Sequence, residues 1–309
     1  MKNKKYKIIM CGCSESGYDL IRELIEYGFK FEYFVTITED KAKELNVSGY
    51  FDFSELANKY NIPIYYAEKY NLKSISDYNF FYSNKFDLLV QGGWQRLFPI
   101  EILNSLRIGA IGVHGSSEFL PKGRGRSPIN WSLIEGKQRF IMHYFIIKAG
   151  VDDGDVFHFE MFDINAWDTC KTLYYKNIIV TKKVLINFIP KLLKNEYTSY
   201  TQEGNPSYYP KRTPDDGKIN WQNTVFEIYN FVRAITKPYP GAFCFVNNFK
   251  ILIWKAQPFD SRIFYMNKTQ GEVLEVFFNG DFIVNCNSGL LLITEYECEI
   301  AINKGFILS

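Results

Sequence analysis

The sequence has no long hydrophobic run, which argues against a membrane-spanning protein. No stretch of about twenty apolar residues, the length that crosses a bilayer, occurs in the chain. The first nine residues carry four lysines and pass directly into a short strand-like run. They lack the longer apolar region and the small-residue cleavage site of a signal peptide. We therefore expect a cytoplasmic protein that enters no membrane.

Paired cysteine motifs are also missing. The six cysteines are scattered, and none of their spacings is Cys-x-x-Cys, so a zinc site is not expected. Residues 149–156 contain three aspartates that could attract a hard cation, but their spacing is not that of a calcium loop. We therefore expect no bound metal, and reduced thiols of which several pack inside a core. The cysteines are Cys11, Cys13, Cys170, Cys244, Cys286 and Cys298.

Neither sign of charge is in clear excess. The chain has 36 basic and 34 acidic residues and a net charge of +2, so we expect no nucleic-acid partner. A hydrophobic content of 47% and a charged content of 23% are typical of a globular protein. The length of 309 residues exceeds that of a usual single core and favours two domains.

The first two thirds of the chain alternate short apolar strands with helices. Leu20, Ile21, Leu24 and Ile25 recur at helical spacing, and Gly28 follows where a helix often ends. This alternation predicts an α/β, Rossmann-like domain, with a mostly parallel sheet and helices on both faces. Strands are predicted at residues 7–12, 31–37, 64–66, 88–90 and 109–113, and further helices at 53–60 and 168–195.

The composition changes near residue 200. Residues 197–217 are rich in Pro, Gly, Tyr, Asn and Asp, which predicts a linker. A helix is predicted at 221–236, and short strands separated by turn signals follow from Ala242 onward. We therefore predict one domain over residues 1–204 and a second over 205–309, made of a helix and a small β-rich, barrel-like fold.

Three loops follow predicted strands, where an open parallel sheet binds its ligands. In the first loop, Gly92 and Gly93 would let the backbone approach a ligand closely, or would only serve the exit from a strand. The second loop, residues 112–131, includes His114, one of three histidines. Histidine titrates near neutral pH, so His114 is either a general acid or base or a satisfied structural residue.

Charged residues in these loops also have two interpretations. The run Lys-Gly-Arg-Gly-Arg at 122–126 would cradle a phosphate, because guanidinium groups match phosphate oxygens, or would be a solvated basic loop. The third loop, 149–156, contains aspartates, one of which could orient His114 and favour its charged form.

Taken together, these loops resemble the folate-dependent formyltransferases. That family's pattern is Asn-x-His-x-Ser-Leu-Leu-Pro, then Arg-Gly-x-x-Pro in a basic segment, and further on Asp-x-Gly-Asp. The family includes glycinamide ribonucleotide formyltransferase, methionyl-tRNA formyltransferase and the nucleotide-sugar N-formyltransferases. The second domain is similar to the sugar branch, especially to the formyltransferase domain of the bifunctional aminoarabinose-modifying enzyme. The matching residues are His114, Ser116, Leu120, Pro121, 124–131 and 152–155, and in the second domain 209–221 and 227–243.

The resemblance implies transfer of a formyl group from 10-formyltetrahydrofolate to the amine of a nucleotide-linked amino sugar, with residues 1–204 as the catalytic domain. His114 would stabilise the oxyanion or protonate the leaving folate nitrogen, and Asp152 would keep His114 in its useful protonation state. No metal is implied. Gln95, Arg96, Leu97 and Phe98 would line the pterin pocket, with Ile147, Lys148 and Val151 as its other wall.

Basic and aromatic residues supply candidates for the nucleotide. Arg124, Arg126, Lys211 and Arg212 would bind the diphosphate, although each would equally serve as a surface cation or a structural pair. Tyr239 would stack on the base or pack within its turn. A homodimer is an open alternative by analogy, because many relatives dimerise through the second domain.

The sequence departs from the family pattern at Gly112, where the family has its catalytic asparagine. Glycine offers no side-chain donor, and losing one oxyanion donor typically costs about 10²–10³ in rate. Ser116, Ser117, Glu118, Asn130 or a water could reach into the vacancy. A carbamoyl or larger acyl group could fill it instead, or the chain could bind folate with weak or no catalysis.

Four function classes therefore stay open. The first is sugar N-formylation, and the second is another acyl or carbamoyl transfer, or formyl-folate hydrolysis, on the same fold. The third is methionyl-tRNA formylation, which needs a basic surface for tRNA phosphates that a net charge of +2 does not favour. The fourth is a non-catalytic folate or nucleotide-sugar binding protein, suggested by Gly112 alone.

Overall fold

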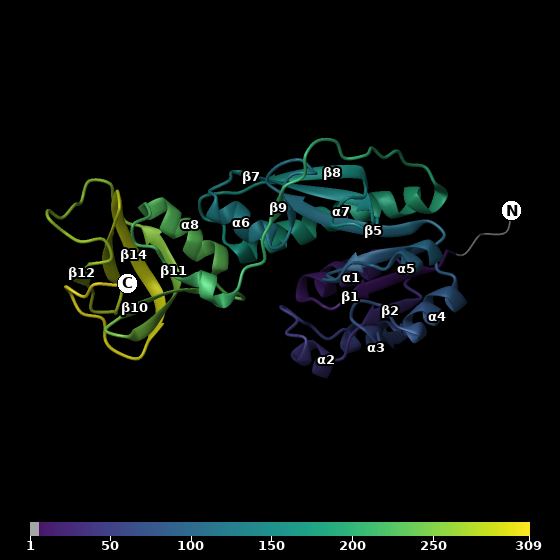
Figure 1. The fold of residues 1–309 in the computed structure, drawn as a ribbon, viewed down its shortest axis with the longest axis horizontal. Coiled ribbons are helices and arrows are strands. Elements are labelled where there is room, and N and C mark those ends of the chain that lie inside the picture. The colour runs from purple at the N-terminus through teal and green to yellow at the C-terminus, as the bar shows by residue number, and fades with distance from the viewer. Residues whose placement is uncertain (1–5) are drawn as a thin grey trace. The chain divides into compact units, whose positions relative to one another are not determined.

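The computed structural model describes residues 6–309, which divide into two compact units (Figure 1). Unit 1 comprises Met1–Gly125, Ile141–Phe162 and Tyr174–Tyr208, and unit 2 comprises Arg126–Phe140, Asp163–Leu173 and Tyr209–Ser309. Within residues 6–309, no helix has the length and apolar character needed to cross a membrane.

The sheet of unit 1 has seven strands in the order β3-β2-β1-β4-β5-β7-β8. The β1/β2, β2/β3, β1/β4 and β4/β5 pairs are parallel, and β5/β7 is antiparallel. The predicted α/β class with a mostly parallel sheet is confirmed. β7 and β8 were not expected from the sequence. The strands are β1 Ile8–Gly12, β2 Tyr33–Thr36, β3 Ile64–Tyr66, β4 Leu88–Gly92, β5 Gly109–Ser116, β7 Arg139–Ile146 and β8 Asp155–Asp163.

Local signals in the sequence account for the first helix. Ser14 caps α1 by accepting a hydrogen bond from the backbone N–H of Gly17, and Leu20, Ile21 and Leu24 are buried on one face. Gly28 ends the helix with a φ of 120°, which a residue with a side chain rarely adopts. The helices that begin or lie in unit 1 are α1 Glu15–Tyr27, α2 Glu39–Glu44, α3 Ser54–Tyr60, α4 Ile75–Asn84 and α5 Ile100–Ser105, and α7 Cys170–Lys194 runs from unit 2 into unit 1.

The order of the strands reverses between β1 and β4, because β2 lies on one side of β1 and β4 on the other. Open sheets of this kind bind ligands outside the carboxyl ends of the strands at such a reversal. The backbone is tightly packed there: a β carbon added to Gly12 or Gly17 would lie 2.1 or 1.9 Å from the carbonyl oxygen of Gly92. Glycine at these positions brings α1 close to the end of β4.

All six cysteines are free, and five of them are buried. Burial raises the pKa of the Cys11 thiol well above its usual value, and the nearby Cys13 adds to the effect. The Cys11 thiol is therefore held protonated at neutral pH, as core side chains are.

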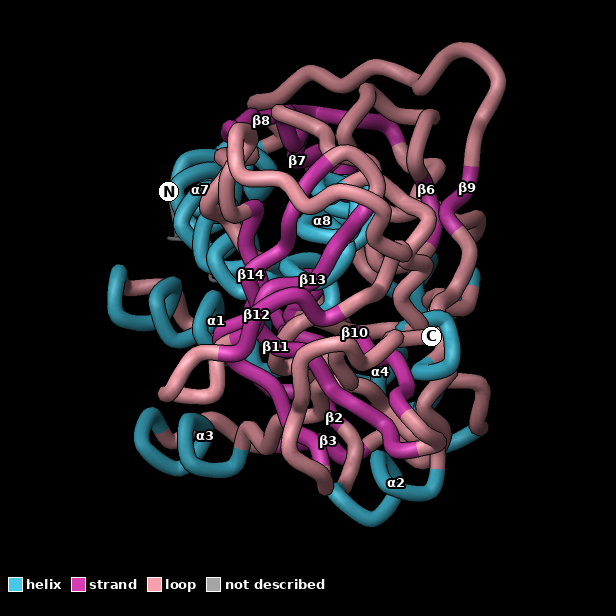
Figure 2. Tube along the Cα trace, turned by 90° about the vertical axis from the view of Figure 1, so that its left-hand side faces the viewer, coloured by secondary structure: helices cyan, strands magenta, loops and turns pink. Residues whose placement is uncertain are grey.

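Unit 2 contains a five-stranded antiparallel sheet in the order β10-β11-β14-β13-β12, visible as magenta strands in Figure 2. Residues 305–309 bond to both edges of this sheet. Ser309 and Phe245 exchange two backbone hydrogen bonds of 2.9 Å, and Val273 donates to Phe306 at 2.8 Å. The predicted barrel-like character comes from this closure. The strands are β10 Ala242–Val246, β11 Phe249–Pro258, β12 Val273–Val276, β13 Phe282–Cys286 and β14 Gly289–Cys298.

The helix predicted at 221–236 begins later than expected. In α8, Val225–Ile235, Thr224 and Glu227 form a capping box that sets the start of the helix. Residues 221–223 form a turn instead. The remaining elements are α6 Pro128–Ile134, a 3-10 helix Pro214–Gly217, and a two-stranded pairing of β6 Arg124–Gly125 with β9 Tyr208–Tyr209.

Candidate active site

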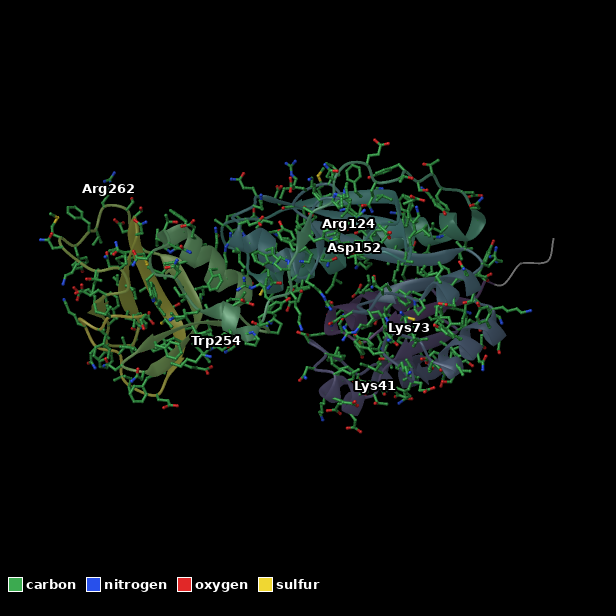
Figure 3. All side chains as sticks on the ribbon, in the orientation of Figure 1. Lys41, Lys73, Arg124, Asp152, Trp254 and Arg262 are labelled. Atoms are coloured by element: carbon green, nitrogen blue, oxygen red, sulfur yellow. The ribbon has the colours of Figure 1, made fainter. Side chains whose placement is uncertain are left out.

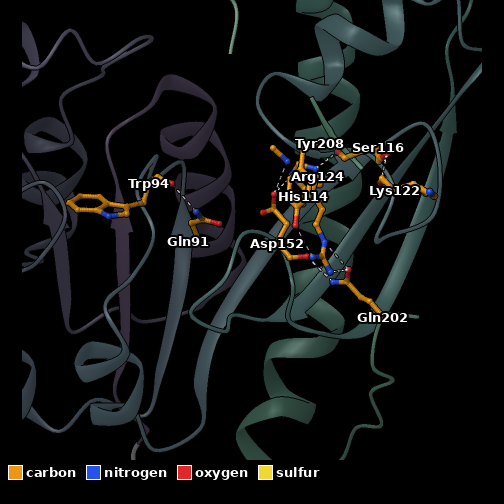
Figure 4. A network of polar contacts seen from close by, with 11 residues as sticks. Gln91, Trp94, His114, Ser116, Lys122, Arg124, Asp152, Gln202 and Tyr208 are labelled. Carbon is orange, nitrogen blue, oxygen red and sulfur yellow. Dashed lines mark hydrogen bonds and ion pairs between the residues drawn. The ribbon is translucent and has the colours of Figure 1, made fainter. Parts of the chain in front are cut away.

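The candidate site centres on His114, which lies near the carboxyl end of β5 with 7% of its surface exposed. Its Nε2 atom lies 2.9 Å from the carbonyl oxygen of Gly123, and its Nδ1 atom lies 3.4 Å from Oδ2 of Asp152 (Figure 4). A carbonyl oxygen only accepts hydrogen bonds, so Nε2 carries a proton. Nδ1 faces a carboxylate, so the doubly protonated ring satisfies both neighbours. The geometry thus suits a positively charged proton donor.

Asp152 is held in an uncommon backbone conformation. Its φ is 49°, in the left-handed region that residues other than glycine rarely adopt. Oδ2 also accepts a hydrogen bond of 3.2 Å from the backbone N–H of Gly125. Such a conformation costs about 1–3 kcal/mol and persists where neighbouring structure holds it, often at functional sites. The loop contacts, including the hydrogen bond from Gly125, thus keep the Asp152 carboxylate facing His114.

A second histidine lies directly opposite His114. His143 is its cross-strand partner in the β5/β7 pair and is 1% exposed. Its Nε2 atom accepts a 3.3 Å hydrogen bond from the backbone N–H of Leu120, so the ring is neutral. Burial, together with the nearby His114, lowers the pKa of His143 from 6.5 to about 4. Sequence reasoning did not select His143, although a histidine within an apolar run was a usable signal.

Phe145 fills the room beside Gly112. The two are cross-strand partners, and a β carbon added to Gly112 would lie 2.4 Å from Cε2 of Phe145 and 2.8 Å from Cγ1 of Ile147. Alternate residues of a strand share a face, so this ring occupies the face that also carries His114. Where the family pattern places an asparagine amide, this chain has an aromatic ring.

The space beside Gly112 is therefore occupied by Phe145 and Ile147. Ser116 Oγ donates to the carbonyl oxygen of Lys122 at 3.0 Å. Asn130, in unit 2, donates its amide to the carbonyl oxygen of Ala234 at 2.6 Å. The group that fills this space, the Phe145 ring, comes from the adjacent strand β7. A sequence motif within β5 alone does not reveal it.

The loop after β4 carries the four residues expected to line a pterin pocket. The side chain of Gln95 bonds to the carbonyl oxygen of Ser48 at 2.7 Å, and the guanidinium of Arg96 lies 4.6 Å from the centre of the Tyr70 ring. Phe98 is buried in the core, whereas Leu97 is 52% exposed. Of the four side chains, Leu97 offers the most apolar surface to a ligand.

The other predicted wall follows β7. Ile147 packs against the core cluster that contains Trp94 and Phe98 and also against the cluster that contains Phe145. It thereby connects the loop after β4 with the strand pair that carries His114. Lys148 is paired with Asp155 at 2.7 Å, and Val151 is exposed.

The candidate phosphate ligands differ in their surroundings. Arg124 is 9% exposed, and its guanidinium donates to Oε1 of Gln202 at 3.2 and 2.6 Å. The guanidinium of Arg212 lies 5.2 and 5.4 Å from the ring centres of Trp131 and Phe231, and burial lowers its pKa. Arg126 and Lys211 are exposed, and Tyr239 is partly buried in the turn after α8.

Residues 200–208, named here the site strap, lie within the segment predicted as a linker. Tyr200 and Val156 exchange two backbone hydrogen bonds of 2.9 Å. Ser207 accepts a 2.9 Å hydrogen bond from the backbone N–H of Gly123. A segment with these contacts is not a free linker, so the prediction is wrong for the site strap. Its polar composition reflects hydrogen bonding to the loops around His114.

Two regions of the chain match known family models. Residues 48–189 match the family described as formyl transferase, and residues 211–301 match the formyl transferase C-terminal domain. A curated relative, the bifunctional polymyxin resistance protein ArnA of Wigglesworthia glossinidia brevipalpis, is 32% identical over 303 residues. That alignment covers 96% of this chain and 44% of the relative, so the chain spans less than half of the relative's length.

Solved structures share the fold. The N-formyltransferase from Helicobacter canadensis, in complex with folinic acid and dTDP-3-aminofucose, has a TM-score of 0.69 at 19% identity, over 95% of this chain and 100% of that one. The sugar 3N-formyl transferase WlaRD, in the presence of dTDP and 5-N-formyl-THF, has a TM-score of 0.67 at 20% identity, over 97% and 100%.

The mostly parallel sheet and the β-rich second unit agree with these matches. The fold and the matches together define an α/β transferase with an additional antiparallel sheet. The chain belongs to the formyl transferase family.

Proposed function

We propose that this chain transfers a formyl group from 10-formyltetrahydrofolate to the amine of a nucleotide-linked amino sugar. The observation that carries the proposal is the His114–Asp152 pair, at 3.4 Å, in a chain of the formyl transferase family. Folinic acid and dTDP-3-aminofucose in the structure from Helicobacter canadensis support both substrates. We place the catalytic role in residues 1–204.

The loops at the sheet edge suit a folate. Exposed apolar side chains, Leu97 and Val151, occur on the loop after β4 and the loop after β7. Gly92 and Gly93, at the end of β4 and the start of this loop, pack closely against Met10 and Ser14, where a side chain would not fit. We propose that Gln95, Arg96, Leu97 and Phe98 form one wall of the pterin pocket, and Ile147, Lys148 and Val151 the other.

The donor supplies a formyl carbon bonded to nitrogen, and the chain supplies charge and protons. In the reaction a bond forms between the attacking amine and the formyl carbon, and the bond from that carbon to the folate nitrogen breaks. The Nε2 proton of His114, which points at the Gly123 carbonyl, would bond more strongly to a developing oxyanion, since charged acceptors form stronger hydrogen bonds.

We propose that His114 and Asp152 also carry out the proton transfers of the reaction. His114 gives a proton to the departing nitrogen, and the attacking amine, which must lose one, restores it. Asp152 stabilises the positive imidazolium before it gives this proton and again after the amine has restored it. The pair thus moves one proton across the site and ends in its starting state.

The Phe145 ring favours a small acyl group. It takes the space beside Gly112 that a carbamoyl or larger group would need. Formyl is the smallest acyl group, and it fits a site narrowed in this way. Without the asparagine amide, His114 carries more of the oxyanion stabilisation.

For the nucleotide we propose the four cations Arg124, Arg126, Lys211 and Arg212, with Tyr239 near the base. The exposed pair, Arg126 and Lys211, is free to meet a diphosphate without giving up contacts seen in residues 6–309. Arg124 and Arg212 already have internal partners, so their contribution would require those contacts to be shared.

The test is tetrahydrofolate release from 10-formyltetrahydrofolate with a panel of dTDP- and UDP-linked amino sugars. We expect sugar-dependent release by the wild type and a loss of about 10²–10⁴-fold in His114→Ala. His158→Ala is a matched control, because His158 lies on β8 beside Glu160 and outside the proposed machinery. Release that ignores the sugar would indicate hydrolysis, and folate binding without release would indicate a binding protein.

A further inference from the structure

One side chain ties the Asp152 loop to the rest of the site. Nε2 of Gln202 donates to the carbonyl oxygens of Asp152 and Gly154 at 2.8 and 2.9 Å (Figure 4). Its Oε1 accepts both hydrogen bonds from the guanidinium of Arg124. The side-chain amide of Gln202 therefore donates hydrogen bonds to the loop that contains Asp152 and accepts hydrogen bonds from Arg124. Arg124 and Asp152 are labelled in the same part of Figure 3, and the close-up in Figure 4 draws both with Gln202.

This arrangement strengthens the hold on the loop. A hydrogen bond from a cation polarises the amide that accepts it, which makes the N–H donors of that amide stronger. The positive charge of the buried Arg124 thus strengthens the hydrogen bonds from Gln202 to the carbonyl oxygens of Asp152 and Gly154. Asp152 is the residue with the left-handed backbone, which persists only if its surroundings hold it.

The site strap also contacts the second partner of His114. Ser207 bonds to the N–H of Gly123, and the carbonyl oxygen of Gly123 faces Nε2 of His114. Gln202 and Ser207 therefore hold the groups on the two sides of the imidazole. The backbone pairing of Tyr200 with Val156 anchors the site strap independently of both side chains.

We propose that Gln202 is a positioning residue that, backed by Arg124, holds the carboxylate of Asp152 against His114. The effect of Gln202 on turnover rests on the proposed function, whereas its effect on the position of Asp152 rests on geometry alone. Gln202 touches no reacting atom. Its loss moves the carboxylate of Asp152 and also removes the Oε1 acceptor of Arg124, one of the proposed phosphate ligands.

The experiment compares Gln202→Ala and Gln202→Glu with Glu203→Ala. Glu203 is the exposed neighbour in the site strap, and no hydrogen bond of its side chain is seen within residues 6–309. A misplacement of about 1 Å in a catalytic group costs about 10²-fold, so we expect that loss in kcat, with an unchanged KM for 10-formyltetrahydrofolate, in both Gln202 variants. Glutamate keeps the acceptor for Arg124 but lacks the two donors, so it should not rescue activity.

Amide hydrogen exchange by NMR gives a readout separate from activity. The N–H of Gly125 donates to Oδ2 of Asp152 and so reports where that carboxylate lies. We expect faster exchange at Gly125 in both Gln202 variants, with Tyr200 protected as in the wild type. The proposal is overturned if kcat is kept, if Glu rescues it, if Gly125 exchange is unchanged, or if Tyr200 loses protection as well. A wild type without turnover would instead reject the proposed function, and Gly125 exchange would still decide the role of Gln202.

Discussion

At the scale of single residues, the candidate site contains two facing pairs in β5 and β7. Gly112 faces Phe145, and His114 faces His143. In each pair the residue on β7 is buried and changes what its partner can do. Phe145 excludes a side chain at 112, and burial lowers the pKa of His143 to about 4, so the ring opposite His114 is neutral.

Gly112 and Phe145 should be energetically coupled. We expect Gly112→Asn to lower the free energy of unfolding by about 1–3 kcal/mol, because its β carbon meets the Phe145 ring. Phe145→Ala should cost about 3–5 kcal/mol through the cavity that it leaves. The double variant should cost clearly less than the sum, since the new side chain enters that cavity. Urea unfolding of the four proteins measures this, and additive costs would contradict the packing described.

His143 should make stability depend on pH. Its pKa is lowered in the folded state to about 4 from 6.5, so below pH 6.5 the unfolded chain binds the extra proton. Stability is therefore lost as the pH falls from about 6.5 towards 4, by about 2 kcal/mol between pH 7 and pH 5. In His143→Gln, whose amide oxygen can still accept from Leu120, this contribution should vanish. Unfolding at the two pH values tests it, with His158→Gln as the control that should keep the full slope.

At the scale of elements, contacts between distant segments give the loops their shape. The site strap is polar and irregular, yet its backbone pairs with Val156 and its side chains bond to two loops. In unit 2, Arg212 lies between Trp131 on α6 and Phe231 on α8. A guanidinium within cation–π distance of two rings joins the two helices.

Arg212 and Lys211 should therefore behave differently. We expect Arg212→Lys to lower the free energy of unfolding by about 1 kcal/mol, because lysine keeps the charge but lacks the broad guanidinium that contacts both rings. Lys211→Ala, at an exposed position, should change it by less than about 0.5 kcal/mol. Thermal unfolding and dTDP binding should be measured together. Weaker nucleotide binding by Arg212→Lys at unchanged stability would assign Arg212 to the phosphate instead.

At the scale of the whole molecule, the near balance of charge bears on the class of substrate. A net charge of +2 provides little long-range attraction for a polyanion. A ligand with a single diphosphate meets few cations, and these interactions are screened only moderately by salt.

Turnover should accordingly tolerate salt. Between 50 and 200 mM salt we expect kcat/KM for the amino sugar to fall by no more than a few-fold. A protein that contacts many nucleic-acid phosphates loses about 10³–10⁵ in affinity over the same range. If activity fell steeply with salt and aminoacylated initiator tRNA accepted the formyl group, the substrate would be a tRNA and not an amino sugar.

Much of the architecture could be predicted from local patterns. Ser14, the apolar spacing within 20–25 and Gly28 determine α1, and the apolar runs mark the parallel strands. β7 and β8 were not predicted, although Gly136 precedes β7 and two glycines lie between the two strands, because the pairing of β7 with β5 is a long-range contact. α8 starts four residues later than predicted, because the capping box lies at Thr224 and Glu227.

The sequence by itself determined the fold class, the family and the histidine on which the site is centred, because strand periodicity and motif order are local properties of the chain. Only the tertiary structure decided what surrounds that histidine. Phe145 lies beside Gly112 through strand pairing, and Gln202 reaches Asp152 from 50 residues away. Such contacts depend on which backbones the fold brings together, and no spacing along the chain records them.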